Sequence, residues 1–128
     1  HVLDEFNNFM EEEIYQMMVA TTEDQNELIL ENTTTLKVAR WWDKACDIIS
    51  CNGGKDIGIQ KILDYFNFNK EEAMAFGDGG NDISMLKYVG TGVAMGNAKD
   101  DVKAIANYIT DSVQEDGIVS ALKHFNII

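Results

Sequence analysis

A short apolar run, Ala73 to Phe76, ends abruptly in a loop of acidic residues and glycines. The pattern predicts a buried strand that leads into Gly77-Asp78-Gly79-Gly80-Asn81-Asp82, after which apolar residues return at helical spacing. In an open α/β sheet, ligands bind beyond the carboxyl ends of the strands, where this loop would lie. Glycines let backbone approach a ligand closely, and the carboxylates of Asp78 and Asp82 suit Mg²⁺. The loop therefore indicates a metal and phosphate site, although Asp-Gly and Gly-Gly also form ordinary turns.

Three other loop motifs do not fit this region. An EF-hand loop that began at Asp78 would need a glutamate where Val89 stands. A dinucleotide-binding fingerprint in the same loop would need a glycine at Asp82. The glycine-rich stretch further upstream is not a P-loop, because Ile49 stands at the first glycine position. These alternatives are excluded.

Length and charge narrow the classes of function. The chain of 128 residues is long enough for one compact core of ordinary size. Its net charge of -12 argues against a nucleic-acid partner, because binding to the phosphate backbone uses clustered Lys and Arg. No stretch approaches the ~20 apolar residues of a membrane span, so we expect no membrane partner.

The two cysteines predict the cellular compartment. Cys46 and Cys51 lie on one expected strand at a spacing that points them to opposite faces, so neither a disulfide nor a zinc pair is expected. Buried free thiols in a reducing cytoplasm are expected instead. The chain begins at His1 rather than at a methionine, and we expect it to be a piece of a longer protein.

The pattern of expected elements changes near residues 52–54. The first part is predicted to be β-rich, with elements over residues 3–12, 14–21, 22–32, 36–42 and 45–51. Within it, a Thr22-x-x-Gln25 capping box opens the second helix. After residue 54, short helices alternate regularly with strands, which predicts right-handed crossovers and a parallel sheet. The fold class is therefore α/β.

Five segments, in order along the chain, carry a family resemblance. They are Gly53-Gly54-Lys55-x-x-Gly58, Gly77-Asp78-Gly79-x-Asn81-Asp82, Met85-Leu86, Gly92-Val93-Ala94-Met95-Gly96-Asn97-Ala98 and Thr110-Asp111-x-x-x-x-Asp116-Gly117-Ile118. With these segments the chain resembles the C-terminal half of a haloacid dehalogenase-superfamily phosphatase of the Cof type. The resemblance implies that residues 53–128 form part of a doubly wound, Rossmann-like parallel sheet with helices on both faces. Residues 1–52 would then be the C-terminal part of an α/β cap domain.

The resemblance also implies a function and a site. The reaction would be Mg²⁺-dependent hydrolysis of small phosphorylated metabolites, such as sugar or cofactor phosphates, through an aspartyl-phosphate. Lys55 resembles the catalytic lysine that steadies the phosphate, and Asp78 resembles the magnesium ligand. Asp82 and Asn81 resemble its supporting acid and amide, which bind the ion directly, through water, or by fixing the loop. Asn97 resembles a residue near the phosphate, with a turn residue as the alternative.

One family feature is absent from the sequence. The nucleophile and general acid of the family form an Asp-x-Asp pair, and no such pair occurs in these residues. We therefore expect this piece alone to be inactive and to self-associate through exposed sheet edges. Alternatives are a non-catalytic binding or regulatory half-protein, or a phosphotransferase of the same superfamily. In the cap part, Arg40, Trp41 and Trp42 could face a substrate, although strand alternation would bury at least one tryptophan.

Overall fold

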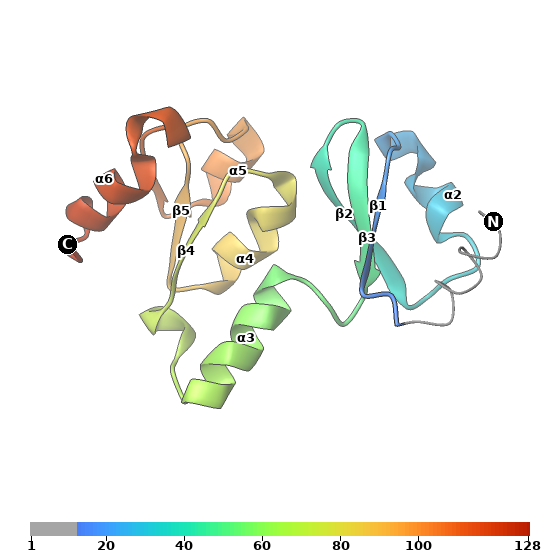
Figure 1. Ribbon diagram of the computed structural model, residues 1–128, viewed down its shortest axis with the longest axis horizontal. Coiled ribbons are helices and arrows are strands. Elements are labelled where there is room, and N and C mark those ends of the chain that lie inside the picture. The colour runs from blue at the N-terminus through green and yellow to red at the C-terminus, as the bar shows by residue number, and fades with distance from the viewer. Residues whose placement is uncertain (1–12) are drawn as a thin grey trace, which may run out of the picture.

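The structure, a computed structural model, describes residues 13–128, which contain two sheets of three strands each (Figure 1). The helix predicted over residues 3–12 lies outside the described residues. The N-terminal part contains β1 (Gln16–Val19), α2 (Asn26–Leu30), β2 (Leu36–Trp42) and β3 (Ala45–Ser50). The C-terminal part contains α3 (Lys55–Phe66), β4 (Met74–Gly77), α4 (Ile83–Tyr88), β5 (Thr91–Ala94), α5 (Asp100–Ile105), β6 (Tyr108–Ile109) and α6 (Gly117–His124). Short 3-10 helices, η1 (Glu23–Gln25), η2 (Lys70–Glu72), η3 (Gly80–Asp82) and η4 (Val113–Glu115), connect these elements.

The N-terminal sheet is antiparallel, with strand order β1-β3-β2, and α2 lies on the side away from the C-terminal part (Figure 1). A turn at Asp43-Lys44 joins β2 to β3, between the two elements predicted over residues 36–42 and 45–51. The predicted capping box is present, since the backbone N–H of Thr22 donates to Oε1 of Gln25 at 3.2 Å. The helix it opens begins as the 3-10 turn η1 and ends at Leu30, two residues earlier than predicted.

The cysteines differ in their surroundings. Cys46 is fully buried in β3, whereas Cys51 is exposed, and neither forms a disulfide within residues 13–128. The prediction of free thiols is confirmed, but the prediction that both are buried is wrong for Cys51. The reason is that β3 ends at Ser50, which places Cys51 in the turn that follows.

The C-terminal sheet is parallel, with strand order β4-β5-β6. Its main core lies between β4, β5, α4 and α5 and consists of Ala75, Leu86, Val89, Ala94, Ala98 and Val102. The helix α6 lies on the other side of the sheet from α4 and α5 (Figure 1), and its Ala121 is fully buried, as is Val93 of β5. Helices thus cover both faces of a parallel sheet, which confirms the predicted α/β class and its doubly wound arrangement.

The two parts meet where β2 approaches the acidic loop. A Cβ on Gly80 would lie 2.8 Å from the carbonyl oxygen of Arg40, so only a glycine allows this close approach. Nearby, Nζ of Lys99 donates to Oδ1 of Asp43 at 2.6 Å, which joins the β2–β3 turn to the loop after β5. The acidic loop, which contains three of the predicted site residues, therefore lies against the N-terminal sheet. Across residues 13–128, we find no helix with the length and apolar character that a membrane crossing requires.

Candidate functional site

Four predicted site residues converge at the carboxyl ends of two neighbouring strands. Asp78 follows β4, Asn97 follows β5, Lys55 begins α3, and Asp82 closes the acidic loop. They line a cavity of about 380 Å³, whose full lining is Lys55, Phe76, Gly77, Asp78, Asp82, Met95, Asn97, Val113 and Ile118. Parallel strands end at the same edge of a sheet, which is why residues far apart in the sequence meet there.

Asp82 is the buried centre of this cluster, with 5% of its surface exposed. Its Oδ1 is ion-paired with the ammonium of Lys55. Its Oδ2 accepts hydrogen bonds from the backbone N–H groups of Asp78 and Gly79, both at 3.0 Å. Both carboxylate oxygens are thus used within the protein. A Cβ on Gly77 would lie 2.5 Å from Cβ of Asp82, so the loop requires a glycine there.

The pKa of Asp82 is lowered by its surroundings. Burial, the largest single influence, raises this pKa, but the Lys55 hydrogen bond, the two backbone N–H groups and the Lys55 charge together outweigh it. Asp82 is therefore ionised at neutral pH and holds Lys55 in place beside the cavity.

This lowered pKa predicts how stability depends on pH. A carboxyl whose folded pKa lies below its unfolded value stabilises the fold above the unfolded pKa, and that stabilisation is lost as the pH falls through the folded pKa. We therefore expect the difference in unfolding free energy between wild type and Asp82→Asn to be constant near neutral pH. It should shrink once the pH falls below the usual Asp value of 3.8. Urea denaturation of both proteins between pH 3 and pH 7 measures this, and a difference that grows towards low pH would contradict it.

Asp78 and Asn97 form the outer part of the cluster. Nδ2 of Asn97 donates to Oδ2 of Asp78 at 3.0 Å, and Oδ1 of Asn97 accepts from the backbone N–H of Val113 at 3.0 Å. Oδ1 of Asp78 has no hydrogen-bond partner within residues 13–128, and the residue is exposed. Asn97 therefore orients Asp78, while Asp78 keeps an oxygen free to face a ligand.

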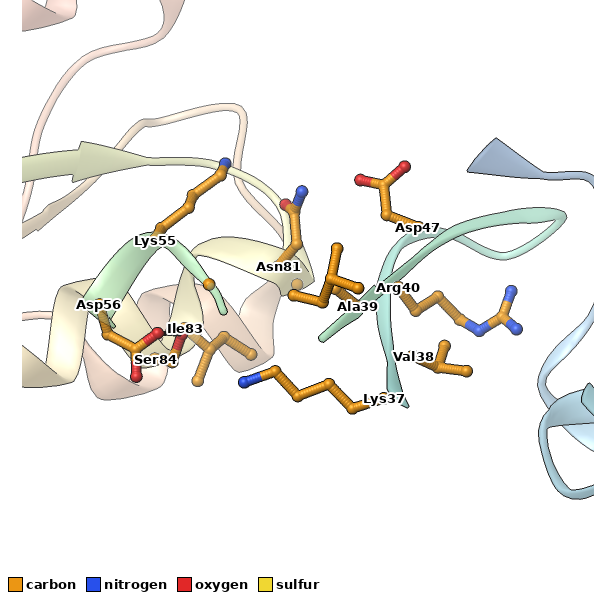
Figure 2. Close-up of a pocket in the computed structure, with 13 residues that line it drawn as sticks. Lys37, Val38, Ala39, Arg40, Asp47, Lys55, Asp56, Asn81, Ile83 and Ser84 are labelled. Atoms are coloured by element: carbon orange, nitrogen blue, oxygen red, sulfur yellow. Dashed lines mark hydrogen bonds between the residues drawn. The ribbon is translucent and has the colours of Figure 1, made fainter. Parts of the chain in front are cut away.

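Asn81 shares a cavity with Lys55 but not with Asp78. It does not line the cavity beside Asp78 but a second cavity, between the N-terminal sheet and α4 (Figure 2). The structure thus places four of the five predicted residues around the first cavity, and the fifth, Asn81, lines only the second one.

The donor set fits part of a magnesium site. Among the residues that the structure describes, no three His, Cys, Asp or Glu side chains gather as a complete metal site. Asp78 offers a carboxylate oxygen, whereas the oxygens of Asp82 are taken by Lys55 and the backbone. Mg²⁺ usually keeps several waters and is held by one or two carboxylates and a substrate phosphate. These residues could therefore supply one direct ligand and its support.

Arg40 does not face the site. Its Nη1 donates to the carbonyl oxygen of Thr21 at 2.7 Å, and its Nη2 donates to Oδ1 of Asn26 at 2.6 Å and the carbonyl oxygen of Thr22 at 3.1 Å. The side chain points away from Lys55 and Asn81 (Figure 2). Arg40 therefore ties the segment before α2 to β2, and the possibility that it meets a substrate anion is not supported.

Both tryptophans are more exposed than predicted. Trp41 is 37% exposed and Trp42 53%, so the expectation that alternation buries at least one is wrong. Their strand is at the edge of its sheet, and its pairing register shifts between Arg40 and Trp42. Such an irregularity at an edge re-aims side chains that strict alternation would have buried.

The second cavity contains residues that sequence reasoning missed. It also measures about 380 Å³, and its polar lining is Lys37, Arg40, Asp47, Lys55, Asp56, Asn81 and Ser84. Asp47 lies within a predicted apolar strand, and it belongs to none of the sequence motifs that indicated a site. Only its odd polarity within the run Ala45 to Ile49 signalled that one face of β3 borders a cavity.

Known proteins resemble this chain along most of its length. The protein YkrA of Bacillus subtilis is 38% identical over 116 residues, which are 91% of this chain and 45% of YkrA. The B. subtilis 5-amino-6-(5-phospho-D-ribitylamino)uracil phosphatase YitU is 47% identical over 79 residues, which are 62% of this chain and 29% of YitU. The solved structure of a subclass IIB sugar phosphatase aligns with a TM-score of 0.87 at 44% identity, over 96% of this chain and 47% of that one.

The chain therefore spans less than half the length of each of these three relatives. The family model for haloacid dehalogenase-like hydrolases matches residues 1–122. Together with the parallel sheet and the ordered segments around Lys55 and Asp78, this match shows that the chain belongs to the haloacid dehalogenase-like hydrolases.

Proposed function

We propose that this chain is part of a Mg²⁺-dependent phosphatase that acts on small phosphorylated metabolites. The observation that carries the proposal is the convergence of Lys55, Asp78, Asp82 and Asn97 on one cavity at the carboxyl ends of β4 and β5. Lys55 supplies an ammonium, and Asp78 supplies a carboxylate oxygen that could bind a cation. The two positive charges would stabilise the charge on the oxygens of a transferring phosphoryl group. The similarity to the phosphatase YitU and to the subclass IIB sugar phosphatase supports the substrate class.

Each residue has a distinct role in this proposal. Lys55 neutralises charge on the phosphate oxygens, and Asp82 holds its ammonium in position. Asp78 would bind Mg²⁺ through its free oxygen, and Asn97 orients Asp78. When bound, Mg²⁺ supplies electrostatic stabilisation of the phosphoryl oxygens in the transition state. Asn81 supports the loop rather than the metal, because it borders the other cavity.

The nucleophile is proposed to lie outside these residues. An aspartate carboxylate could attack the phosphorus and displace the alcohol of the ester, which leaves an aspartyl-phosphate. Water then hydrolyses this intermediate to inorganic phosphate and the free aspartate. The 128 residues contain no Asp-x-Asp pair, and the relatives extend well beyond the aligned region. In this account residues 1–52 form part of a cap, residues 53–128 form part of the catalytic core, and the protein acts in the cytoplasm.

Phosphate release from p-nitrophenyl phosphate tests the proposal. The full-length protein should release phosphate with Mg²⁺ and lose the activity in EDTA, whereas the 128-residue chain should be inactive. Two alternatives predict other outcomes. A non-catalytic regulatory protein would be inactive at full length as well, and a phosphotransferase would pass the phosphoryl group to an added sugar phosphate faster than to water.

The 128-residue chain alone should bind Mg²⁺ weakly. Asp78 provides a single direct carboxylate, and Mg²⁺ gives up its waters reluctantly. We therefore expect a dissociation constant in the millimolar range, which corresponds to about −4 kcal/mol. Isothermal titration calorimetry measures it. Tight binding at one ion per chain would contradict the proposed donor set.

The same chain should also self-associate. Within residues 13–128, β4 pairs only with β5, so its other edge has unpaired backbone groups. In addition, four apolar side chains on α3 and directly after it are exposed: Ile62, Tyr65, Phe66 and Phe68. Open edges and apolar patches favour association with another chain. Size-exclusion chromatography with light scattering should show dimers or larger species, and a stable monomer across micromolar concentrations would contradict this.

A further inference from the structure

The second cavity is connected to the proposed catalytic site through Lys55. Lys55 lines both this cavity and the one beside Asp78. A phosphomonoester with its phosphate at Lys55 would therefore place its leaving group in the second cavity, between the N-terminal sheet and the loop that contains Asn81. The residues that border this space are those that can distinguish one leaving group from another.

Asp47 projects into this space from β3. It pairs with Ala39 of β2 and Met18 of β1, which sets its position on the sheet. Figure 2 shows its carboxylate on the same side of the cavity as the Lys55 ammonium and the Asn81 amide. Asp47 is half-buried and makes no hydrogen bond or ion pair with other residues of the described chain, 13–128.

The neighbouring cation does not neutralise Asp47. Nζ of Lys37 donates to the carbonyl oxygen of Cys51 at 3.3 Å, and the side chain extends towards Asp56 and Ser84 on the far side of the cavity (Figure 2). An ionised carboxylate only accepts hydrogen bonds. A half-buried carboxylate without a partner therefore binds most favourably to a ligand with a charged donor. It binds least favourably to a ligand that carries a second anion.

We propose that Asp47 is a specificity-determining residue that binds a hydrogen-bond donor on the leaving group of the substrate. An ammonium is preferred to a hydroxyl, and a carboxylate is rejected. The Asn81 amide, which points to the same side, offers a second contact to the same part of the ligand. This inference rests on the proposed phosphatase function, and it adds the residue and the polarity that select the substrate.

Three sugar phosphates with the phosphate on the same carbon test this selection. For the full-length protein, kcat/KM should fall in the order glucosamine 6-phosphate, glucose 6-phosphate, 6-phosphogluconate. The change Asp47→Asn keeps the shape and removes the charge. It should lower the ratio of kcat/KM for glucosamine 6-phosphate to that for 6-phosphogluconate by 10- to 100-fold, the usual size of one charged contact. Asp47→Ser should lower it in the same direction if the asparagine variant fails to fold.

A matched control removes a charge from the same part of the chain. Asp24 lies on η1 and is exposed, so Asp24→Asn should leave the substrate ratio unchanged. A ratio that Asp47→Asn does not move, or turnover of p-nitrophenyl phosphate with none of the three sugar phosphates, overturns the inference and leaves the phosphatase function standing. No turnover of any phosphomonoester overturns the proposed function itself.

Discussion

Asp78→Asn in the full-length protein is expected to lower kcat/KM for p-nitrophenyl phosphate by about 10³-fold, the size of effect expected when a charged group that stabilises the transition state is lost. The amide has the shape of the carboxylate but lacks its charge, so the free oxygen that faces the cavity would no longer bind Mg²⁺ well. Because Asn97 already donates to this side chain, the amide also risks placing its own NH₂ against a donor.

The control for this variant is a carboxylate that contacts nothing in the site. Asp64 lies exposed on α3 and makes no side-chain hydrogen bond within residues 13–128. Asp64→Asn should retain wild-type kcat/KM. Equal activities for Asp78→Asn and wild type, at both low and high Mg²⁺, would remove the metal role from Asp78.

Asp82→Ala is expected to lower the free energy of unfolding by about 3 kcal/mol. The change removes a buried carboxylate that accepts two backbone N–H bonds and pairs with Lys55, and hydrogen bonds to charged groups are the strong ones. This loss is at the lower end of the range measured for broken buried ion pairs. The reason is that the side chain of Lys55 is 49% exposed, so water can solvate its ammonium once the partner is removed. The transition seen in urea denaturation of the full-length protein measures the loss.

Two comparisons sharpen this second result. Asp64→Ala, at the exposed position, should change stability by no more than ~0.5 kcal/mol. If the Lys55 pair contributes as proposed, Asp82→Ala and Lys55→Met should be less than additive in a double-mutant cycle. A loss below ~1 kcal/mol for Asp82→Ala would show that the loop does not depend on its carboxylate.

Local patterns predicted most of the fold correctly. The strand before Gly77, the acidic loop and the helix after it follow from residues close together in the chain, and all three are present. The same holds for the β2–β3 hairpin and the capping box at Thr22. Parallel topology was predictable as well, because strands that alternate with short helices leave few other arrangements.

Contacts between distant residues could not be predicted in the same way. Sequence reasoning placed Lys55 and Asp82 in one site through the family resemblance, but their direct pairing spans 27 residues and appears only in the folded chain. It also did not find Asp47, because that residue acquires its cavity only where the two parts of the chain meet. The tryptophans were mispredicted for a related reason, since a register shift at an edge strand breaks the alternation that was assumed.

In the proposed reaction, this chain supplies the lysine and the metal-binding loop, and the nucleophile lies outside the 128 residues. The direct measurement is acid quenching of the full-length protein during turnover of a radiolabelled phosphomonoester, followed by hydroxylamine treatment and peptide mapping. We predict a Mg²⁺-dependent label that hydroxylamine releases, as expected for an acyl phosphate, on a peptide outside these 128 residues. Label on an acid within the chain, or steady turnover without any trapped label, would contradict the account.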